Sequence, residues 1–458
     1  MWKPKDLDEE RPLYLAIAEA LQRDIAEGRL EAGARMPTQR ELSRTVGVDL
    51  STITRAYAEG ARRGLLSATV GRGTFVSADV AVSVPLLPDD AHDAGLLEMG
   101  LVLPLYSLEK ELAEELRTVI AETDIAPYLR YSEPRGMAEH REAGARWVGR
   151  YGIRAEAEDI LIASGTQNGL ASVLMALLKP GDRLAVEALS YPGLKTVAAM
   201  LGIKLVPIPM DKDGLIPEEL EAACRRDAPR GLYLMPEVQN PTTVALSEGR
   251  RDAIADIVLR HGLVLLEDDA YADTREERRP ALGSRIPDNA IFFGGISKMF
   301  GAGLRISFLA VPRRFAGPIE RALLATVWMA SPLTAMLVAH VMGSGAAERI
   351  IEAKKIEARR RSALAIASLS SASFHCPSAG FFGWLELPSG WTGRSFEIEA
   401  RAKGLRLFCA EKFAVGGRSP AAVRLSLSGP ETLKDLERGM GIVAGILARG
   451  PRSEAAML

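Results

Sequence analysis

The pattern of apolar and polar positions changes near residue 78 of the chain. Before this point, Tyr14, Ile17, Leu21 and Ile25 lie three or four positions apart, which is the spacing of one face of a helix. After it, short apolar runs alternate with amphipathic stretches. The chain is therefore expected to contain two domains of different kinds.

Residues 78–94, with the sequence ADVAVSVPLLPDDAHDA, consist mostly of small and acidic residues and include Pro88. This composition is typical of a linker. It separates a first domain in residues 1–77 from a second domain in residues 95–458.

A helix, a turn and a second helix are predicted within the first domain. Thr38 and Glu41 have the spacing of a capping box that begins a helix, and Gly47 suits the end of that helix. Asp49 can cap the next helix, which covers residues 50–63. The pattern is that of a helix-turn-helix.

The second of these helices is expected to bury Ile53, Ala56 and Tyr57 and to expose the short polar and basic side chains of its N-terminal half. After it, the strand-like runs LLSATV and TFVS flank a hairpin tip that carries Arg72. Such a helix can present its side chains to base edges and phosphates in the major groove. A small helical domain with solvated arginines is an alternative interpretation of the pattern alone.

The second domain alternates strands and helices. Six short apolar runs read as strands: RLAVEAL, KLVPIPM, GLYLMPE, LVLLEDDA, AIFFGG and ISFLAVP. Stretches such as PEELEAACRR and EGRRDAIADIVLRHG are amphipathic and separate most of them. This alternation predicts an α/β fold with a mainly parallel sheet covered by helices on both faces. Ligands are then expected at the carboxyl ends of the strands.

Composition and charge fit a globular protein with a local basic region. The chain has 458 residues, of which 47% are hydrophobic and 25% charged, enough to bury a large core. The net charge is only -2, but residues 35–73 contain seven arginines and three acidic residues. Any nucleic-acid surface is therefore expected to be local. The three cysteines lie far apart, without metal or disulfide spacing, and the N-terminus lacks a signal peptide, so a cytoplasmic location is expected.

One uncharged run, residues 322–347, is long enough to raise the question of a membrane span. Ser331, Thr334, His340 and Ser344 interrupt it. We therefore expect buried helices broken at a proline, Pro332, and no membrane span.

Four features follow predicted strands or lie close to them. ASGTQNGL places Thr166 and Gln167 at a helix start, whose backbone N–H groups suit a phosphate. Asn240 lies past one strand, and another ends in three acidic residues within EDDAY, with Tyr271 three residues after Asp268. Lys298 lies between AIFF and ISFLAVP. A surface lysine in a loop would explain this last residue alone, but not the four features in this order.

Together the features suit one ligand with a phosphate, a basic ring nitrogen and an electrophilic carbonyl. Asp268 ends a buried strand and needs a partner such as a protonated ring nitrogen. Lys298 would form an aldimine with the carbonyl, and its neutral amine is favoured by burial and by Arg305. Pyridoxal 5'-phosphate (PLP) has all three groups.

The first domain resembles the GntR-type winged helix-turn-helix over almost its whole length. The matching strings are GRLEAGARMPTQREL, VGV, TITRAY and GRGTFV. The resemblance implies that six residues face DNA: Thr38, Arg40, Ser51, Thr52, Arg55 and Arg72. Leu50 departs from the pattern, because that family often has an arginine there.

The second domain resembles the fold type I PLP-dependent aminotransferases, which have a mainly parallel sheet and an additional small domain. The matching strings are YSEPRG, ASGTQNGL, YPG, QNPTT, EDDAY, ISK with GLR, and VRLSLS. The resemblance implies that the cofactor contacts these residues: Gly165, Thr166, Gln167, Tyr191, Asn240, Asp268, Tyr271, Ser297, Lys298 and Arg305.

The same resemblance implies two further contacts. Arg424 would bind a substrate carboxylate, and Tyr131 would reach the phosphate of the partner subunit in a homodimer. Three positions depart from the pattern. Gly295 stands where a serine or threonine is common, Ala302 where a proline is common, and Thr243 where a glycine is usual.

The combination of both domains is similar to the MocR subfamily of bacterial transcriptional regulators. It implies a DNA-binding regulator that senses PLP or an amino compound through aldimine chemistry at Lys298. A working transaminase with an attached DNA-binding domain is the alternative. A third hypothesis makes the large domain a dimerisation scaffold, but the presence of Lys298, Asp268, Asn240 and Arg424 argues against it.

Overall fold

The computed structural model describes most of the chain: residues 2–5, 7, 12–26, 29–30, 34–62, 65–69, 73–76, 95–416 and 419–451. Contacts within the chain define two units, one of residues 1–84 with 416–418 and one of residues 85–415 with 419–458. The predicted linker and Arg72 lie outside the described residues.

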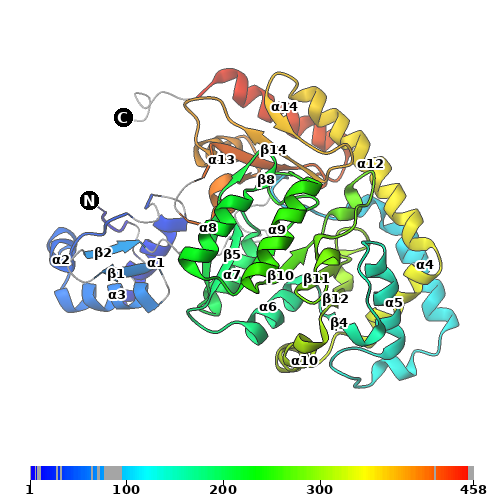
Figure 1. The fold of residues 1–458 in the computed structure, drawn as a ribbon. Helices are drawn as coiled ribbons and strands as arrows, with labels where there is room; N and C mark the ends of the chain where they lie inside the picture. The colour runs from blue at the N-terminus through cyan, green and yellow to red at the C-terminus, as the bar shows by residue number, and fades with distance from the viewer. Residues whose placement is uncertain are drawn as a thin grey trace. The chain divides into compact units, whose positions relative to one another are not determined.

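The described part of the N-terminal unit contains three helices and a two-stranded antiparallel sheet (Figure 1). They are α1 (Leu13–Ala26), α2 (Gln39–Val46), α3 (Leu50–Arg62), β1 (Leu66–Thr69) and β2 (Gly73–Val76). The capping box is confirmed, because Thr38 Oγ1 accepts from Glu41 N while the Glu41 carboxylate accepts from Thr38 N. Gly47 ends α2 with a φ of 72°, which suits glycine.

The core of this unit forms where the helical spacing predicts it. Ile17, Leu21, Ile53 and Tyr57 are buried in one cluster. The Tyr57 hydroxyl donates to Pro37 O at 2.7 Å, so the inner face of α3 is fixed against the chain ahead of α2. The polar N-terminal half of α3 therefore faces away from the core.

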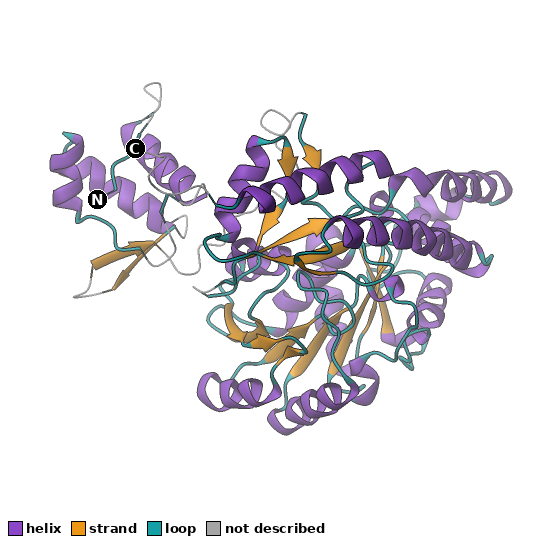
Figure 2. Cartoon of the chain, turned by 90° about the horizontal axis from the view of Figure 1, so that it is seen from above, coloured by secondary structure: helices purple, strands orange, loops and turns teal. Residues whose placement is uncertain are grey.

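Seven strands form the central sheet of the large unit (Figure 2). Their order is β4 (Ile160–Ala163), β12 (Ser307–Ala310), β11 (Ala290–Gly295), β10 (Val264–Asp268), β9 (Gly231–Leu234), β5 (Arg183–Glu187) and β6 (Lys204–Ile208). All neighbours are parallel except the two pairs that include β12. The mainly parallel sheet is thus confirmed, and β4 is a strand that the six apolar runs did not include.

The sheet is buried on both faces because its strands are apolar at consecutive positions. Leu232 and Leu234 of β9 belong to the hydrophobic cluster on one face of the sheet, and Tyr233 belongs to the cluster on the other face. Helices α8 (Pro217–Asp227) and α9 (Glu248–His261) contribute to the first cluster. Helices from the other face, such as α6 (Thr166–Leu177), contribute to the second.

The remaining helices of the large unit surround this core and extend to a second sheet (Figure 1). They are α4 (Glu109–Glu122), α5 (Ala138–Gly149), α7 (Pro192–Met200), α10 (Arg313–Val327), α11 (Pro332–Gly343), α12 (Ala346–Ser368), α13 (Gly393–Ala402) and α14 (Leu433–Arg449). The second sheet has the order β13 (Ser373–His375), β14 (Phe382–Glu386), β17 (Ala422–Ser426) and β16 (Phe408–Cys409). Short pairs complete the fold: β3 (Leu97–Glu98) with β15 (Leu405–Arg406), and β7 (Met210–Asp211) with β8 (Gly214–Leu215).

The uncharged run of residues 322–347 covers the end of α10, all of α11 and the first two residues of α12, and Pro332 begins α11 as expected. It is not buried throughout, because Leu324, Val327 and Trp328 are exposed. Their exposure corrects the expectation of wholly buried helices. No helix among the described residues is both long and apolar enough to cross a membrane.

Candidate functional site

Lys298 lies three residues beyond β11, at the edge of the sheet where the parallel strands end. Its side chain is partly buried, and Nζ donates to Val102 O at 2.6 Å. Burial, followed by the nearby charges of Arg424 and Arg305, lowers the pKa of Lys298 to about 8. At neutral pH a larger fraction of this amine is therefore in the neutral form that attacks a carbonyl than in a solvated lysine.

Asp268 ends β10 and is buried close to this lysine. Its Oδ2 accepts from the Tyr233 hydroxyl at 2.9 Å, while its Oδ1 is buried without a hydrogen-bond partner among the described residues. Burial raises the pKa of Asp268 to about 6. A protonated ring nitrogen would satisfy the second oxygen and stabilise the charged carboxylate.

A cradle for an anion forms where α6 begins. Gly165 has a φ of 81°, and a Cβ placed on it would lie 2.3 Å from a guanidinium nitrogen of Arg305. The glycine thus leaves room for Arg305 beside the start of α6, where backbone N–H groups can bind an anion. Arg305 also contacts Ser297 Oγ at 3.4 Å. The predicted phosphate residues are brought together at this helix start.

Gly295, one of the departures from the family pattern, has a local explanation. A Cβ at this position would lie 2.4 Å from Thr166 Oγ1. Ser307, which pairs with Gly295 across the sheet, contacts Thr166 Oγ1 at 3.4 Å. A buried hydroxyl therefore lies beside Thr166, although it comes from β12 and not from β11.

Gln167 and Tyr191 lie side by side at the starts of α6 and α7. Gln167 Nε2 donates to Gly193 O at 3.0 Å, and its Oε1 is buried without a partner among the described residues. A Cβ on Gly193 would lie 2.5 Å from the Tyr191 ring. Burial raises the pKa of Tyr191 to about 12, so its hydroxyl remains protonated at neutral pH.

Arg424 lies on β17 and is buried, with 5% of its surface exposed. One terminal nitrogen donates to Asn240 Oδ1 at 2.6 Å and the other to Gly100 O at 2.5 Å. Burial lowers the pKa of Arg424 to about 10. The guanidinium remains charged at neutral pH and can bind a carboxylate through two parallel hydrogen bonds.

Aromatic rings surround this arginine. The guanidinium carbon lies 4.8 Å from the Phe413 centroid, 5.5 Å from Phe382 and 5.6 Å from Phe408. Tyr271 contacts Phe382 with a centroid distance of 5.0 Å, and the Lys298 amine lies 5.8 Å from the Tyr271 ring. Arg424 and Lys298 are therefore bordered by one continuous set of aromatic rings.

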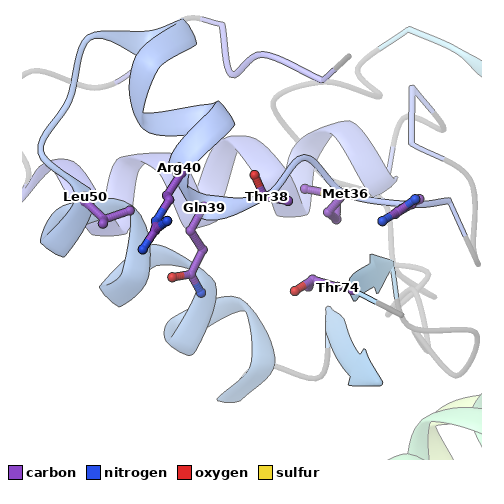
Figure 3. Close-up of a pocket in the computed structure, with 8 residues that line it drawn as sticks. Met36, Thr38, Gln39, Arg40, Leu50 and Thr74 are labelled. Carbon is purple, nitrogen blue, oxygen red and sulfur yellow. The ribbon is translucent and has the colours of Figure 1, made fainter. Parts of the chain in front are cut away.

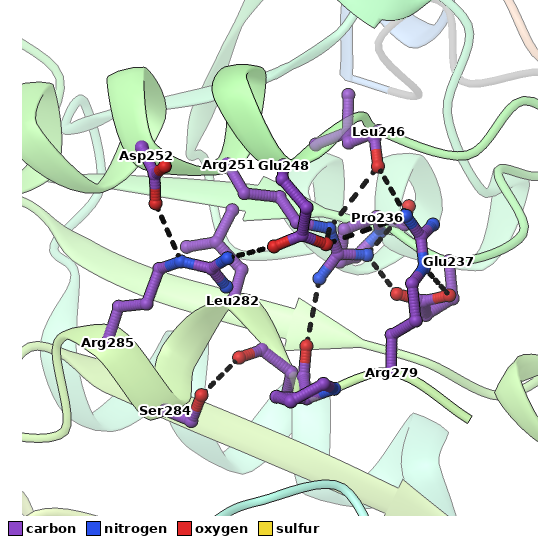
Figure 4. Close-up of polar contacts among 12 residues, drawn as sticks. Pro236, Glu237, Leu246, Glu248, Arg251, Asp252, Arg279, Leu282, Ser284 and Arg285 are labelled. Carbon is purple, nitrogen blue, oxygen red and sulfur yellow. Dashed lines mark hydrogen bonds and ion pairs between the residues drawn. The ribbon is translucent and has the colours of Figure 1, made fainter. Parts of the chain in front are cut away.

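A buried ionic network holds the loop that carries Asn240 (Figure 4). Arg251 of α9 is fully buried and forms an ion pair with Glu237. It also donates to Pro236 O at 3.4 Å and to Leu246 O at 3.3 Å, at the two ends of the loop. The position of Asn240 beside Arg424 thus depends on contacts from α9, the helix that follows the loop.

Tyr131 does not join this group of residues. It is 83% exposed, and its ring lies 5.6 Å from that of Trp328. Its role at the phosphate of a partner subunit stays a prediction.

In the N-terminal unit, a pocket of about 440 Å³ lies between the start of α2, the start of α3 and β2 (Figure 3). Three of the residues that line it are Thr38, Arg40 and Leu50. Arg40 is exposed and Leu50 is 40% exposed. The departure at Leu50 therefore places an apolar side chain among polar and basic ones.

Apart from Arg72, which lies outside the described residues, the other residues predicted to face DNA lie on α3. Ser51 and Arg55 are exposed, and Thr52 is partly buried. Arg55 stacks on Tyr14 of α1, with its guanidinium carbon 4.2 Å from the ring centroid. This contact orders the arginine on the surface of the unit.

Sequence reasoning missed several groups of the site. Tyr233 and Ser307 lie inside apolar runs, where one polar residue gives little signal. The carbonyl groups of Gly100 and Val102 cannot be recognised from residue type at all. Each contacts a residue that the sequence did identify: Asp268, Thr166, Arg424 and Lys298.

The residues present fit PLP. The buried, unpartnered oxygen of Asp268 suits the ring nitrogen, and the cradle of Gly165 and Arg305 suits the phosphate. Lys298 suits the aldehyde because its amine has a lowered pKa. Fold and site thus define an aminotransferase-type protein with an additional N-terminal helix-turn-helix unit.

Comparison with known families agrees with this class. Residues 104–438 match the family "Aminotransferase class I and II", and residues 13–76 match "Bacterial regulatory proteins, gntR family". The chain belongs to the MocR-type proteins, in which a GntR helix-turn-helix is fused to an aminotransferase class I and II domain.

Two of the relatives are regulators by name. The chain is 38% identical over 97% of its length to the HTH-type transcriptional regulator YdeF of Bacillus subtilis (strain 168), 96% of which is covered. It is 25% identical over 85% of its length to the vitamin B6 salvage pathway transcriptional repressor PtsJ of Salmonella typhimurium, with 93% of that protein covered.

The chain is also similar to solved aminotransferases. One is LysN, the alpha-aminoadipate aminotransferase of Thermus thermophilus, solved in complex with N-(5'-phosphopyridoxyl)-L-leucine. The TM-score is 0.72 with 25% sequence identity, over 86% of this chain and 98% of that structure.

Proposed function

We propose that the chain is a PLP-binding, DNA-binding transcriptional regulator that senses PLP or an amino compound at Lys298. The observation that carries this proposal is the convergence of three groups in one site. They are the Lys298 amine with its lowered pKa, the unpartnered Asp268 oxygen, and the anion cradle formed by Gly165 and Arg305. The GntR match in residues 13–76 supports the regulatory reading.

PLP supplies an aldehyde that condenses with a primary amine and a ring that withdraws electrons from the product. Lys298 would provide the amine, and Asp268 would hold a proton on the ring nitrogen by remaining ionised. Thr166, Gln167, Ser297 and Arg305 would bind the phosphate end.

The remaining residues would position the ring and a ligand. Tyr191 would stack on the ring, and Tyr271 would contact its hydroxyl oxygen. Asn240 would also contact this hydroxyl oxygen, and its Oδ1 would orient Arg424. Arg424 would bind the carboxylate of an amino compound.

The DNA-binding part is proposed to act from residues 1–77, separated by a linker of residues 78–94 from the sensing part in residues 95–458. The residues that would contact an operator are Thr38, Arg40, Ser51, Thr52, Arg55 and Arg72. A cytoplasmic location without a membrane anchor fits a DNA-binding protein.

We further propose a homodimer formed through the surface around Tyr131. Leu129 is 67% exposed, Tyr131 83% and Trp328 55%, and the rings of Tyr131 and Trp328 are in contact. Leu324 and Val327 of α10 add exposed apolar area beside Trp328. Such a grouping of large apolar residues is typical of a subunit interface.

A working transaminase is the second candidate. The aromatic surroundings of Arg424 close to Lys298 favour it, since they would hold an amino acid next to the amine. The similarity to an alpha-aminoadipate aminotransferase is a further argument. A regulator needs only the exchange of one amine for another, whereas turnover also needs Lys298 to carry protons repeatedly.

The decisive experiment measures colour, DNA binding and turnover on the same protein. PLP should give the full chain a visible absorbance band that Lys298→Ala removes. An amino acid that changes this band should also change affinity for DNA fragments selected by the full chain from a random pool, by about 5-fold to 150-fold. A protein that stays colourless with PLP contradicts the proposal. Rapid turnover with an oxo acid, with DNA affinity unaffected, favours the transaminase.

A second experiment tests the DNA surface. The double variant Arg40→Ala, Arg55→Ala should lose affinity for the selected fragments by about 1 to 3 kcal/mol per base contact and show a smaller salt dependence. Arg225→Ala is the matched control, because this arginine is 74% exposed in the large unit. Equal affinity of both variants would remove the assignment of α2 and α3 to DNA.

A further inference from the structure

Three alternate carbonyl groups near the start of the large unit each accept a hydrogen bond from a cationic side chain. Gly100 O accepts from Arg424 at 2.5 Å and Val102 O from Lys298 at 2.6 Å. Pro104 O accepts from Lys354 at 2.9 Å. We call Gly100–Pro104 the carbonyl strap.

The strap is fixed before its first residue. β3 pairs with β15, and Met99 N donates to Arg406 O at 2.8 Å. Gly100 packs so closely on Phe408 that a Cβ would lie 2.8 Å from the ring. In the sequence, residues 95–99 separate the strap from the predicted linker of residues 78–94.

Lys354 fixes the other end of the strap. It is fully buried on α12 and donates both to Pro104 O and to Phe300 O, each at 2.9 Å. Phe300 lies two residues beyond Lys298. The end of the strap and the loop of Lys298 are therefore joined by an amine that is not part of the proposed cofactor site.

The middle contact cannot survive condensation of Lys298 with an aldehyde. A lysine ammonium carries three N–H donors and the neutral amine two. When the amine condenses, its nitrogen forms a double bond to the aldehyde carbon, and the aldehyde oxygen leaves as water with two protons. The linked nitrogen would keep at most one proton, and none in its neutral form. That nitrogen would also be held by the aldehyde carbon, so Val102 O would lose its donor.

We propose that the carbonyl strap is a latch that Lys298 closes through Val102 O and that PLP opens by taking the lysine amine. The inference rests on the proposed function, because PLP must be the partner of Lys298. Both ends of the strap stay fixed, through Lys354 and through β3, so the change is confined to the middle. Occupation of the site would thus loosen the strap, which lies a few residues after the predicted linker in the sequence.

Amide hydrogen exchange of the full chain tests the latch. The peptide that covers residues 97–105 is followed with PLP, with pyridoxamine 5'-phosphate and with neither. Pyridoxamine phosphate has the same ring and phosphate but an amine in place of the aldehyde, so it cannot condense with Lys298. PLP should speed exchange in the strap by at least about tenfold, as expected for the loss of one hydrogen bond to a charged group. Pyridoxamine phosphate should leave the exchange slow.

Two variants of Lys298 separate the hydrogen bond from the cofactor. Lys298→Met removes the donor at similar side-chain length and should exchange rapidly in the strap with or without PLP. Lys298→Arg keeps a cationic donor that cannot condense, and its strap should stay slow in both conditions. Peptides from α14 serve as the internal control for global unfolding in each variant.

The possible outcomes are distinguishable. If PLP gives no visible band, the proposed function fails, and the latch fails with it. If PLP gives the band but exchange in the strap is unchanged, the latch alone is wrong. Equal speeding by PLP and pyridoxamine phosphate, or slow exchange in Lys298→Met, also overturns the latch and leaves PLP binding intact.

Discussion

At the scale of single residues, Thr243 shows how a departure from a family pattern is accommodated. Its φ is 67°, in the left-handed region that glycine adopts without strain. Its backbone N–H donates to Gln239 O at 2.7 Å and closes the turn that contains Asn240. The chain therefore places a β-branched residue where the backbone favours glycine, close to a residue of the proposed site.

We expect Thr243→Gly to stabilise the large unit by about 0.5 to 1 kcal/mol. A left-handed conformation costs a residue with a Cβ about 1 to 2 kcal/mol, and glycine loses part of this gain through the entropy of its unfolded chain. Denaturant unfolding followed by tryptophan fluorescence checks the change. Thr242→Gly is the control and should destabilise, because the Thr242 hydroxyl donates to Gln239 Oε1 at 2.7 Å. A destabilised Thr243→Gly would contradict the argument.

The lowered pKa of Lys298, about 8, predicts the pH dependence of PLP binding. Condensation needs the neutral amine, so apparent affinity should rise with pH up to about 8 and level off above it. A lysine with the ordinary pKa of about 10.4 would give affinity that still rises above pH 9. Arg424→Gln should move the plateau to higher pH, since the charge of Arg424 helps to lower the pKa. Titration of the visible band with PLP measures both, and a plateau at the same pH in wild type and variant would refute the cause.

At the scale of elements, local signals predicted more than long-range contacts did. The capping box at Thr38, the turn at Gly47 and the strand before Asp268 follow from residues a few positions apart. The antiparallel β12 and the sheet around β17 depend on pairing between distant segments, which no local pattern encodes. For the same reason the residues of the proposed site could be selected by type, whereas the partners of Asp268 and Lys298 could not.

The network around α9 should contribute strongly to the stability of its loop. Arg251→Met leaves the buried Glu237 without its main cation, so we expect a loss of about 3 to 5 kcal/mol in the free energy of unfolding of the large unit. Arg285→Met is the matched control. Arg285 pairs with Glu248 and Asp252, whose side chains are 58% and 67% exposed, and should cost at most about 1 kcal/mol. Equal losses in the two variants would show that burial of the pair is not the cause.

At the scale of the whole molecule, the exposed apolar side chains of the described residues include scattered positions and a group around Trp328. Ile398 is 58% exposed and Met200 81%, each on a different helix. Leu324, Val327 and Trp328 instead follow one another along the end of α10, and Trp328 contacts Tyr131. Single exposed apolar residues are common, whereas a group of this kind indicates a partner.

We therefore expect Trp328→Glu combined with Leu324→Glu to convert the proposed homodimer into monomers. Two carboxylates would have to lose their hydration if the surface were still covered. Sedimentation equilibrium gives the mass directly. Ile398→Glu should leave the mass unchanged, and a double variant with the mass of the wild type would place any interface elsewhere.

The carbonyl groups that hold lysines also decide which amine can be labelled chemically. Burial lowers the pKa of Lys195, Lys298 and Lys354 to about 8 in each case, so basicity does not distinguish them. Lys195 donates to two carbonyl groups and so does Lys354, whereas Lys298 donates to one. An aldehyde probe must break two hydrogen bonds at Lys195 or Lys354 but only one at Lys298. Among these three buried lysines, reductive tagging at low probe concentration should therefore favour Lys298.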